Sequence, residues 1–237
     1  FLSGFIALEY LDSPRQALEH FRALRVRVSS PISLARAGYW EGRAHTRAGD
    51  PVAAQAAYEF AAEHQTAYYG QLAAARLGWG LDPALVKGSE YPDWQDTSLA
   101  QSDLLAAAKL LYDLGDRYEA RRFLIQLAGQ LQTEAALGAL TDLMLAWNEP
   151  NFALKLGKVA ARQGIVLPRA YFPLPGAVPD GLTAPADLVL AITRRESEFD
   201  SRARSRSDAR GLMQLLPGTG RMMARKLDLP FTAAELT

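Results

Sequence analysis

Cysteine is absent from this 237-residue sequence, which excludes disulfides and thiolate metal sites. Its three histidines, His20, His45 and His64, lie far apart and lack the paired spacing of a zinc-binding helix. No stretch reaches the roughly 18 consecutive apolar residues of a membrane-spanning helix. We therefore expect no metal, no cofactor and no integral membrane segment.

Neither charge is in excess, because 26 Lys and Arg residues balance 26 Asp and Glu residues. A formal charge of zero argues against a general nucleic-acid binder. The arginine- and serine-rich run 201–211 is short and has no interleaved aromatic residues, so we interpret it as a solvated loop. The composition, 49% apolar and 22% charged, is typical of a globular protein and excludes disorder as the main description.

The chain begins at Phe1 without a methionine or a basic leader, and it stops at Thr237 soon after an amphipathic stretch begins. We interpret it as an internal piece of a longer protein. The absence of a targeting signal then carries no information about location.

Residues 1–165 show the three- and four-residue spacing of apolar side chains that is typical of amphipathic helices. Short breakers interrupt this pattern, and an alanine early in the next helix follows each of them. These alanines are separated by 37, 66 and 33 residues, close to the roughly 34-residue period of tetratricopeptide-like helix pairs. Because one pair cannot bury its apolar face alone, we expect a scaffold of stacked pairs. The breakers are Asp12-Ser13-Pro14, Gly49-Asp50-Pro51, Gly115-Asp116 and Asn148-Glu149-Pro150, and the alanines are Ala17, Ala54, Ala120 and Ala153.

Two further features of this scaffold are a pair of adjacent aromatic residues and a break in the repeat. Tyr39 and Trp40 could stack on a sugar, but we interpret them as filling the groove between paired helices, because large aromatic side chains dominate protein cores. The repeat breaks between Gly78 and Pro92, where several glycine and proline residues predict a long connection.

Proline and glycine become frequent after Val166, so residues 166–184 predict a linker rather than a regular helix. A helix follows, with Thr183 as the expected N-cap and Pro185 in its first turn, and it runs to Ser197. The pattern therefore predicts a second α-helical domain over 185–237. The linker residues that carry this prediction are Pro168, Pro173, Pro175, Gly176, Pro179 and Gly181.

Glu196 is the candidate catalytic residue of that helix. Val189, Ile192 and Phe199 share one helix face with it by steps of three and four residues, so we expect Glu196 on the apolar side near the helix C-terminus. Desolvation and the negative helix end both favour a neutral carboxyl group, and they predict a pKa that moves from about 4.3 toward roughly 6. The alternative is that Glu196 pairs with a neighbouring arginine.

Gln214 is a polar residue among apolar neighbours in the segment 211–219. A buried amide needs hydrogen-bond partners, which a bound sugar could supply. A satisfied core amide explains the local sequence equally well. Pro217 marks the start of another helix in this segment.

Two sets of residues together resemble the soluble lytic transglycosylase family. The later set is similar to the family's catalytic motif in residue type and spacing, and the earlier set resembles its α-superhelical domain. The resemblance covers most of the chain. The later set is Ala191, Ile192, Arg194, Glu196, Ser197, Phe199, Ser205, Ala209, Gly211, Leu212, Met213, Gln214, Pro217 and Thr219, and the earlier set surrounds Tyr39-Trp40, Gly49-Asp50 and Tyr69-Gly70.

The resemblance implies an all-α fold in which an α-superhelical helix-pair solenoid precedes an incomplete lysozyme-like α domain. Residues 1–165 would be the scaffold, 166–184 the linker and 185–237 the first part of the catalytic domain. The implied substrate is the glycan strand of peptidoglycan, and the implied location is the periplasm. The scaffold is also a candidate docking surface for other cell-wall enzymes, and no nucleic-acid partner is expected.

The implied reaction cleaves the β-1,4 bond between N-acetylmuramic acid and N-acetylglucosamine and leaves a 1,6-anhydro sugar. By the resemblance, Glu196 is the catalytic acid and base. Ser205 is a polar partner near the muramoyl group, Met213 shapes the subsite wall, and Gln214 is a sugar-contacting amide.

The spacing of the carboxylates agrees with a mechanism that uses one of them. An ordinary glycosidase needs two carboxylates that flank the bond. Glu198 is expected to face the other side of the helix from Glu196, and Asp200 is expected to be a turn residue. A second catalytic carboxylate is therefore not predicted in this segment.

Two of the departures from the family pattern bear most on the expected site. Asp208 stands where the family loop has glycine, but aspartate tolerates left-handed backbone, so we expect the turn to survive. The family's downstream tyrosine-containing segment does not occur before Thr237, so we expect an incomplete catalytic domain with little or no activity by itself. Two alternatives are a non-catalytic helical-repeat binding module and a hydrolytic muramidase of the goose-lysozyme type.

Overall fold

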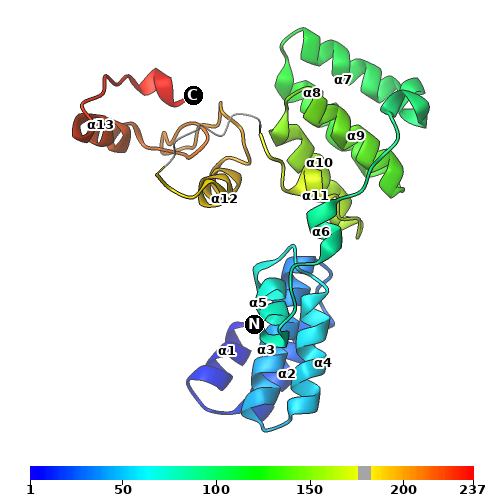
Figure 1. Cartoon of the computed structure of the whole chain (residues 1–237), viewed down its shortest axis with the longest axis vertical. Helices are drawn as coiled ribbons and strands as arrows, with labels where there is room; N and C mark the ends of the chain where they lie inside the picture. The colour runs from blue at the N-terminus through cyan, green and yellow to red at the C-terminus, as the bar shows by residue number, and fades with distance from the viewer. Residues whose placement is uncertain (176–182) are drawn as a thin grey trace. The chain divides into compact units, whose positions relative to one another are not determined.

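The computed structural model describes residues 1–175 and 183–237, which form two compact units, Phe1–Gly88 and Ser89–Thr237. Within the described residues every regular element is helical (Figure 1), and isolated β-bridges beside Arg210 are not part of a strand. The prediction of an all-α fold is confirmed. None of the described helices is both long enough and apolar enough to cross a membrane.

The first unit is a stack of consecutive helices. Its helices are α1 (Leu2–Glu9), α2 (Pro14–Arg25), α3 (Pro31–Arg47), α4 (Pro51–Ala62), α5 (Tyr68–Leu77) and α6 (Pro83–Lys87). Each of α2 to α5 packs on the helix before it. Proline opens α2, α3, α4 and α6, where its missing N–H costs nothing because the first amides of a helix have no partner within it. The five-residue α6 lies in the predicted connection between Gly78 and Pro92.

The core of the first unit contains both aromatic residues that the sequence singled out. Tyr39 is 6% exposed and Trp40 is 8% exposed, so their interpretation as core residues is confirmed. Gly42 allows α3 and α4 to approach closely, because a Cβ atom there would lie 2.7 Å from the Tyr58 ring.

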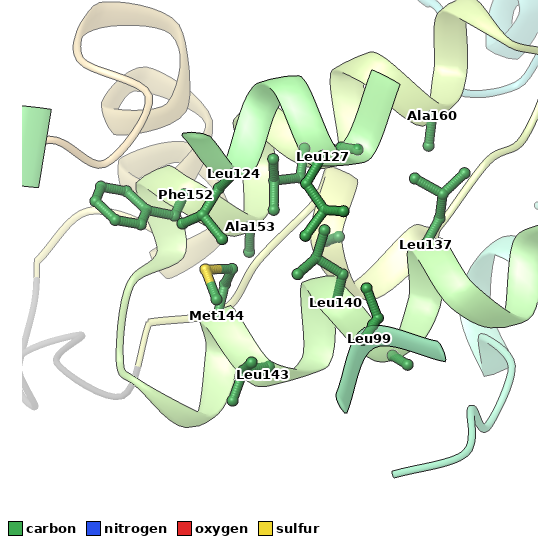
Figure 2. Packing of buried hydrophobic residues seen from close by; sticks show 14 of the residues in the cluster. Leu99, Leu124, Leu127, Leu137, Leu140, Leu143, Met144, Phe152, Ala153 and Ala160 are labelled. Carbon is green, nitrogen blue, oxygen red and sulfur yellow. The ribbon is translucent and has the colours of Figure 1, made fainter. Parts of the chain in front are cut away.

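The second unit continues with short 3-10 turns and longer helices. Its elements are η1 (Trp94–Asp96), η2 (Ser98–Gln101), α7 (Asp103–Asp113), α8 (Arg117–Gln130), α9 (Glu134–Ala146), α10 (Pro150–Arg162), α11 (Pro168–Tyr171), α12 (Ala186–Glu196), α13 (Pro217–Lys226) and η3 (Ala233–Leu236). Helix α10 packs against α8, α9 and α11, so it is central to this unit. Figure 2 shows the apolar side chains of its core, including Leu124, Leu140, Met144 and Phe152, each with at most 1% exposed.

The four predicted breakers coincide with helix boundaries, while the repeat of tetratricopeptide-like helix pairs stays a prediction. The four breakers separate α1 from α2, α3 from α4, α7 from α8 and α9 from α10. Ala17, Ala54, Ala120 and Ala153 are all buried, with at most 5% exposed. The small side chains at these positions therefore lie in the packed interior.

The predicted linker 166–184 is described only in part. It contains the four-residue helix α11, which begins at Pro168. Gly176, Pro179 and Gly181 lie outside the described residues. The prediction of Thr183 as N-cap is wrong, because the N-cap of α12 is Pro185, which offers no side-chain hydrogen bond.

Candidate active site

The candidate active site is built around the C-terminal end of α12 (Figure 1). The helix ends at Glu196, and the Ser197 amide closes it by donating to Thr193 O at 3.1 Å. Glu198 and Phe199 then adopt left-handed backbone, with φ angles of 55° and 63°. Such backbone costs a residue with a side chain roughly 1–2 kcal/mol, so tertiary contacts must hold this turn.

Glu196 is exposed, so the prediction that it lies on a buried apolar face is wrong. The reason is that this face of α12 is largely left uncovered by the described residues, whereas Phe199, the last residue of the predicted face, is buried beyond the helix through the left-handed turn. Ile192, one turn earlier, is itself 38% exposed. The expected desolvation of the Glu196 carboxyl group is therefore not provided by the described residues.

The alternative ion pair between Glu196 and a neighbouring arginine is not present within the described residues either. Arg194 donates from Nε to Tyr171 O at 2.9 Å, and its guanidinium lies 4.8 Å from the ring centroids of both Tyr171 and Phe172. These contacts hold the Arg194 side chain on the segment that follows α10. The Glu196 carboxylate is thereby left available to a ligand.

Ser197 connects the end of α12 to the turn that contains Gln214. Its hydroxyl donates to Leu212 O at 2.8 Å and approaches Thr193 O at 3.2 Å, and the residue is 9% exposed. Two parts of the motif that are 15 residues apart in the sequence are thus joined by one side chain. The sequence marked Ser197 as part of the motif, but it did not reveal this role.

Replacing Ser197 with alanine is expected to loosen this connection. The Leu212 carbonyl would lose its partner, and a hydrogen bond of this kind contributes about 1 kcal/mol, which corresponds to a fall in Tm of about 2–4 °C for a chain of this size. Thermal unfolding followed by circular dichroism measures the change. Ser207→Ala is the matched control, because Ser207 is exposed and its hydroxyl has no described hydrogen bond. Equal Tm values for the two variants would contradict the role of Ser197.

Ser205 organises the loop that precedes this turn. Its Oγ accepts from the Ser207 amide at 3.2 Å and the Ala209 amide at 3.0 Å, and its own amide donates to Ala209 O at 2.9 Å. Asp208 completes the loop with a φ of 64°, which confirms that aspartate supports left-handed backbone here. Hydrogen bonds from Arg210 and then Arg204 hold the pKa of Asp208 below its usual value.

The side-chain amide nitrogen of Gln214 makes hydrogen bonds within the protein. Nε2 donates to Ala203 O at 3.1 Å and to Gly211 O at 3.0 Å, and the residue has a φ of 50°. These bonds close the hairpin-like loop 203–214. They agree with the alternative of an amide satisfied by the protein, while the contact with a sugar stays a prediction.

Met213 lies at the edge of a cavity of about 540 Å³ in the second unit. The cavity is bounded by apolar side chains such as Phe199 and Leu212 and by charged ones such as Arg117 and Arg202. Of the four predicted site residues, Met213 alone lines it; Glu196, Ser205 and Gln214 do not. The structure therefore brings Ser205 and Gln214 into one loop and Met213 to a cavity wall, with Glu196 tied to that loop through its neighbour Ser197.

The other two acidic residues near the end of α12, Glu198 and Asp200, contact groups other than Glu196. Glu198 accepts hydrogen bonds from Lys155 and Lys158 of α10. Burial alone would raise the pKa of Glu198, but the two ammonium groups outweigh burial and hold it at about 2. Asp200 accepts from the Arg202 amide at 3.1 Å, as expected of a turn residue, and lies 3.7 Å from an Arg121 nitrogen. Neither carboxylate is placed as a partner of Glu196.

A metal-dependent site is not indicated by the part of the chain that the structure describes. No group of three or more His, Cys, Asp or Glu side chains is gathered there in a way that could hold a metal ion.

A family model described as "Transglycosylase SLT domain" matches residues 181–234, which include all four predicted site residues. This part of the chain is therefore similar to SLT domains. The resemblance to soluble lytic transglycosylases that the motif predicted is thereby confirmed. The matched region contains α12, the loop 203–214 and α13.

The chain is also similar to one curated sequence over part of its length. A predicted soluble lytic murein transglycosylase of Haemophilus influenzae is 40% identical to this chain over 69 residues. The match covers 29% of this chain and 12% of that protein. The chain therefore matches a small part of this relative's length.

Solved structures show a similar fold over nearly the whole chain. The 70 kDa soluble lytic transglycosylase of Escherichia coli matches with a TM-score of 0.66 and 19% identity, over 94% of this chain and 36% of that one. A complex of the 70 kDa soluble lytic transglycosylase with bulgecin A matches with a TM-score of 0.69 and 18% identity, over 97% and 36% of the two chains. An inactive glutamate-to-glutamine mutant of the lytic transglycosylase Slt of Pseudomonas aeruginosa matches with a TM-score of 0.60 and 24% identity, over 94% and 38%.

Proposed function

We propose that the protein is a peptidoglycan lytic transglycosylase, a carbon–oxygen lyase that acts on a polysaccharide. It would cleave the β-1,4 bond between N-acetylmuramic acid and N-acetylglucosamine and form 1,6-anhydro-N-acetylmuramic acid. The observation that carries the proposal is the SLT domain, in which Glu196 stands at the end of α12 and Ser197 binds the carbonyl of Leu212.

Glu196 would act first as an acid and then as a base. Its carboxyl group would donate a proton to the glycosidic oxygen, so that the bond to C1 breaks and N-acetylglucosamine leaves with a 4-hydroxyl group. The resulting carboxylate would accept the proton of the muramoyl 6-hydroxyl as O6 bonds to C1. Because the nucleophile belongs to the same sugar, ring closure is intramolecular and needs no ordered water.

The engagement of Glu198 and Asp200 supports a reaction that uses one carboxylate. Retaining and inverting glycosidases place a second carboxylate across the bond. Here Glu198 is bound to two lysines and Asp200 caps a turn. In addition, a bound glycan would exclude water from the exposed Glu196, and desolvation favours the neutral form that donates a proton.

The proposal also includes the domain organisation that the sequence predicts. Residues 1–165 would form a scaffold of tetratricopeptide-like helix pairs, 166–184 a linker, and 185–237 the first part of a lysozyme-like catalytic domain. Ser205, Met213 and Gln214 would contact the substrate. The protein would work on glycan strands in the periplasm, and its scaffold would be available to other cell-wall enzymes.

The reaction products distinguish this proposal from hydrolysis. We expect the full-length protein to release anhydromuropeptides from purified peptidoglycan, which mass spectrometry detects as products lighter by one water than hydrolytic ones. Release of reducing-end sugars would instead identify a muramidase. Binding to peptidoglycan without any product would identify a non-catalytic module.

A further inference from the structure

Glu198 is held by one face of α10. Asn151, Lys155 and Lys158 are spaced by four and three residues, so they lie along the same side of that helix. The two lysine ammonium groups bind different oxygens of the Glu198 carboxylate. Asn151 donates from Nδ2 to the backbone carbonyl of Glu198 at 2.9 Å. Both the side chain and the backbone of Glu198 are therefore fixed by the same helix.

The contact between α10 and Glu198 is connected to the protein core. Asn151 is 2% exposed, and its Oδ1 accepts from Arg121 of α8 at 3.1 Å. The same guanidinium lies 3.7 Å from Asp200, so residues on both sides of Phe199 are tied to α8 and α10. Phe199 between them is 6% exposed. The turn is thus held at three successive positions.

This arrangement lies directly after the proposed catalytic residue. Glu196 is followed by the Ser197 cap, and the chain then turns through the left-handed Glu198 and Phe199. Residues with side chains keep that backbone only where their surroundings hold it. The α10 contacts supply such a restraint, and two ammonium groups keep the carboxylate of Glu198 ionised, with its pKa at about 2 despite burial that would raise it.

We propose that Glu198 is a positioning residue, through which α10 fixes the turn after α12 and so the direction in which Glu196 is presented to the glycan. This inference rests on the proposed function, because it assigns Glu198 to the same reaction. Glu198 does not touch the reacting atoms. It acts through the backbone that joins it to Glu196.

The test is Glu198→Gln in the full-length protein, with turnover of purified peptidoglycan as the main readout. We expect kcat to fall about 10- to 100-fold, because a small displacement of an acid has effects of this size. KM is expected to change less than about twofold, because α10 is not proposed to bind substrate. We also expect the pH dependence of kcat to shift, which a purely structural contact would not cause.

A second set of variants separates the positioning role from general destabilisation. Lys155→Met combined with Lys158→Met should reproduce the loss, whereas Lys87→Met, at an exposed lysine of the first unit, should leave kcat unchanged. Glu198→Lys combined with Lys155→Glu and Lys158→Glu should restore part of the activity. Hydrogen exchange at the amides of residues 196–200 should be faster in Glu198→Gln than in the wild-type protein.

The outcomes distinguish this inference from the proposed function. If the wild-type protein forms anhydro products and Glu198→Gln matches its kcat and pH profile, the positioning role is overturned and the function stands. Faster exchange without any loss of kcat, or unchanged exchange, also overturns it. If the wild-type protein forms no anhydro product, the proposed function fails, and the positioning role for that reaction fails with it.

Discussion

Glu196→Gln is expected to abolish the release of anhydromuropeptides by the full-length protein. Glutamine has nearly the same shape but cannot donate and then recover a proton, and general acid–base catalysis contributes about 10²–10⁴-fold to a rate. We therefore expect kcat to fall by about 10³-fold or more. Because Glu196 is exposed and its side chain has no hydrogen bond or ion pair within the described residues, Tm should stay close to that of the wild-type protein. Chromatography of the digested peptidoglycan measures the loss.

The control for this substitution is Glu90→Gln. Glu90 is also exposed, it lies far from α12 in the sequence, and it carries the same change of charge. We expect it to retain full activity. Turnover by Glu196→Gln within a few fold of the wild-type rate would exclude the proposed acid and base.

Gly211→Ala is expected to cause a large loss of stability in the region 181–234, which matches the SLT family model. Gly211 has a φ of 71°, and a Cβ atom there would lie 1.7 Å from Leu236 O. The left-handed backbone costs alanine roughly 1–2 kcal/mol, and overpacking adds about 1–3 kcal/mol. The chain would have to move η3 away from the loop 203–214, so the connection of Ser197 to Leu212 would be strained as well. We expect a fall in Tm on the order of 10 °C.

Limited proteolysis with trypsin measures the loosening of the loop 203–214 directly, because this loop contains several arginine residues after which trypsin cleaves. Trypsin should cut after Arg204 or Arg210 much faster in Gly211→Ala than in the wild-type protein. Gly218→Ala is the matched control, since Gly218 lies in the first turn of α13 and a Cβ atom there would meet nothing within 4 Å. It should be neutral or stabilising by up to about 1 kcal/mol. Equal cleavage rates in the two variants would show that the close approach to Leu236 O does not matter.

The scaffold was largely predictable because its signals are local. Proline and aspartate act within the first turn of a helix, as when Asp50 Oδ1 accepts from the Ala53 amide at 3.0 Å. Such contacts depend on residues three or four positions apart, so they can be read directly from the chain. The prediction of Thr183 as an N-cap failed because a proline two residues later occupied that position instead.

The candidate site was predictable in residue type but not in geometry. The spacing of Glu196, Ser205, Met213 and Gln214 was enough to identify the SLT motif, and residues 181–234 match that family. The burial of Glu196 was predicted wrongly, because the helix face that it shares with Ile192 is largely left exposed by the described residues. The bonds of Gln214 to Ala203 and Gly211 could not be distinguished from a sugar contact by sequence alone.

The amino-acid sequence by itself determined that this protein is all-α, where most of its helices begin, and which motif it carries. Only the tertiary structure decided that Glu196 faces solvent, that Ser197 binds Leu212, and that Lys155 and Lys158 bind Glu198. The reason is physical. Helix periodicity and capping arise between near neighbours in the chain, whereas the contacts of Glu198 join residues 40 and 43 positions apart, which only the packing of α10 brings together.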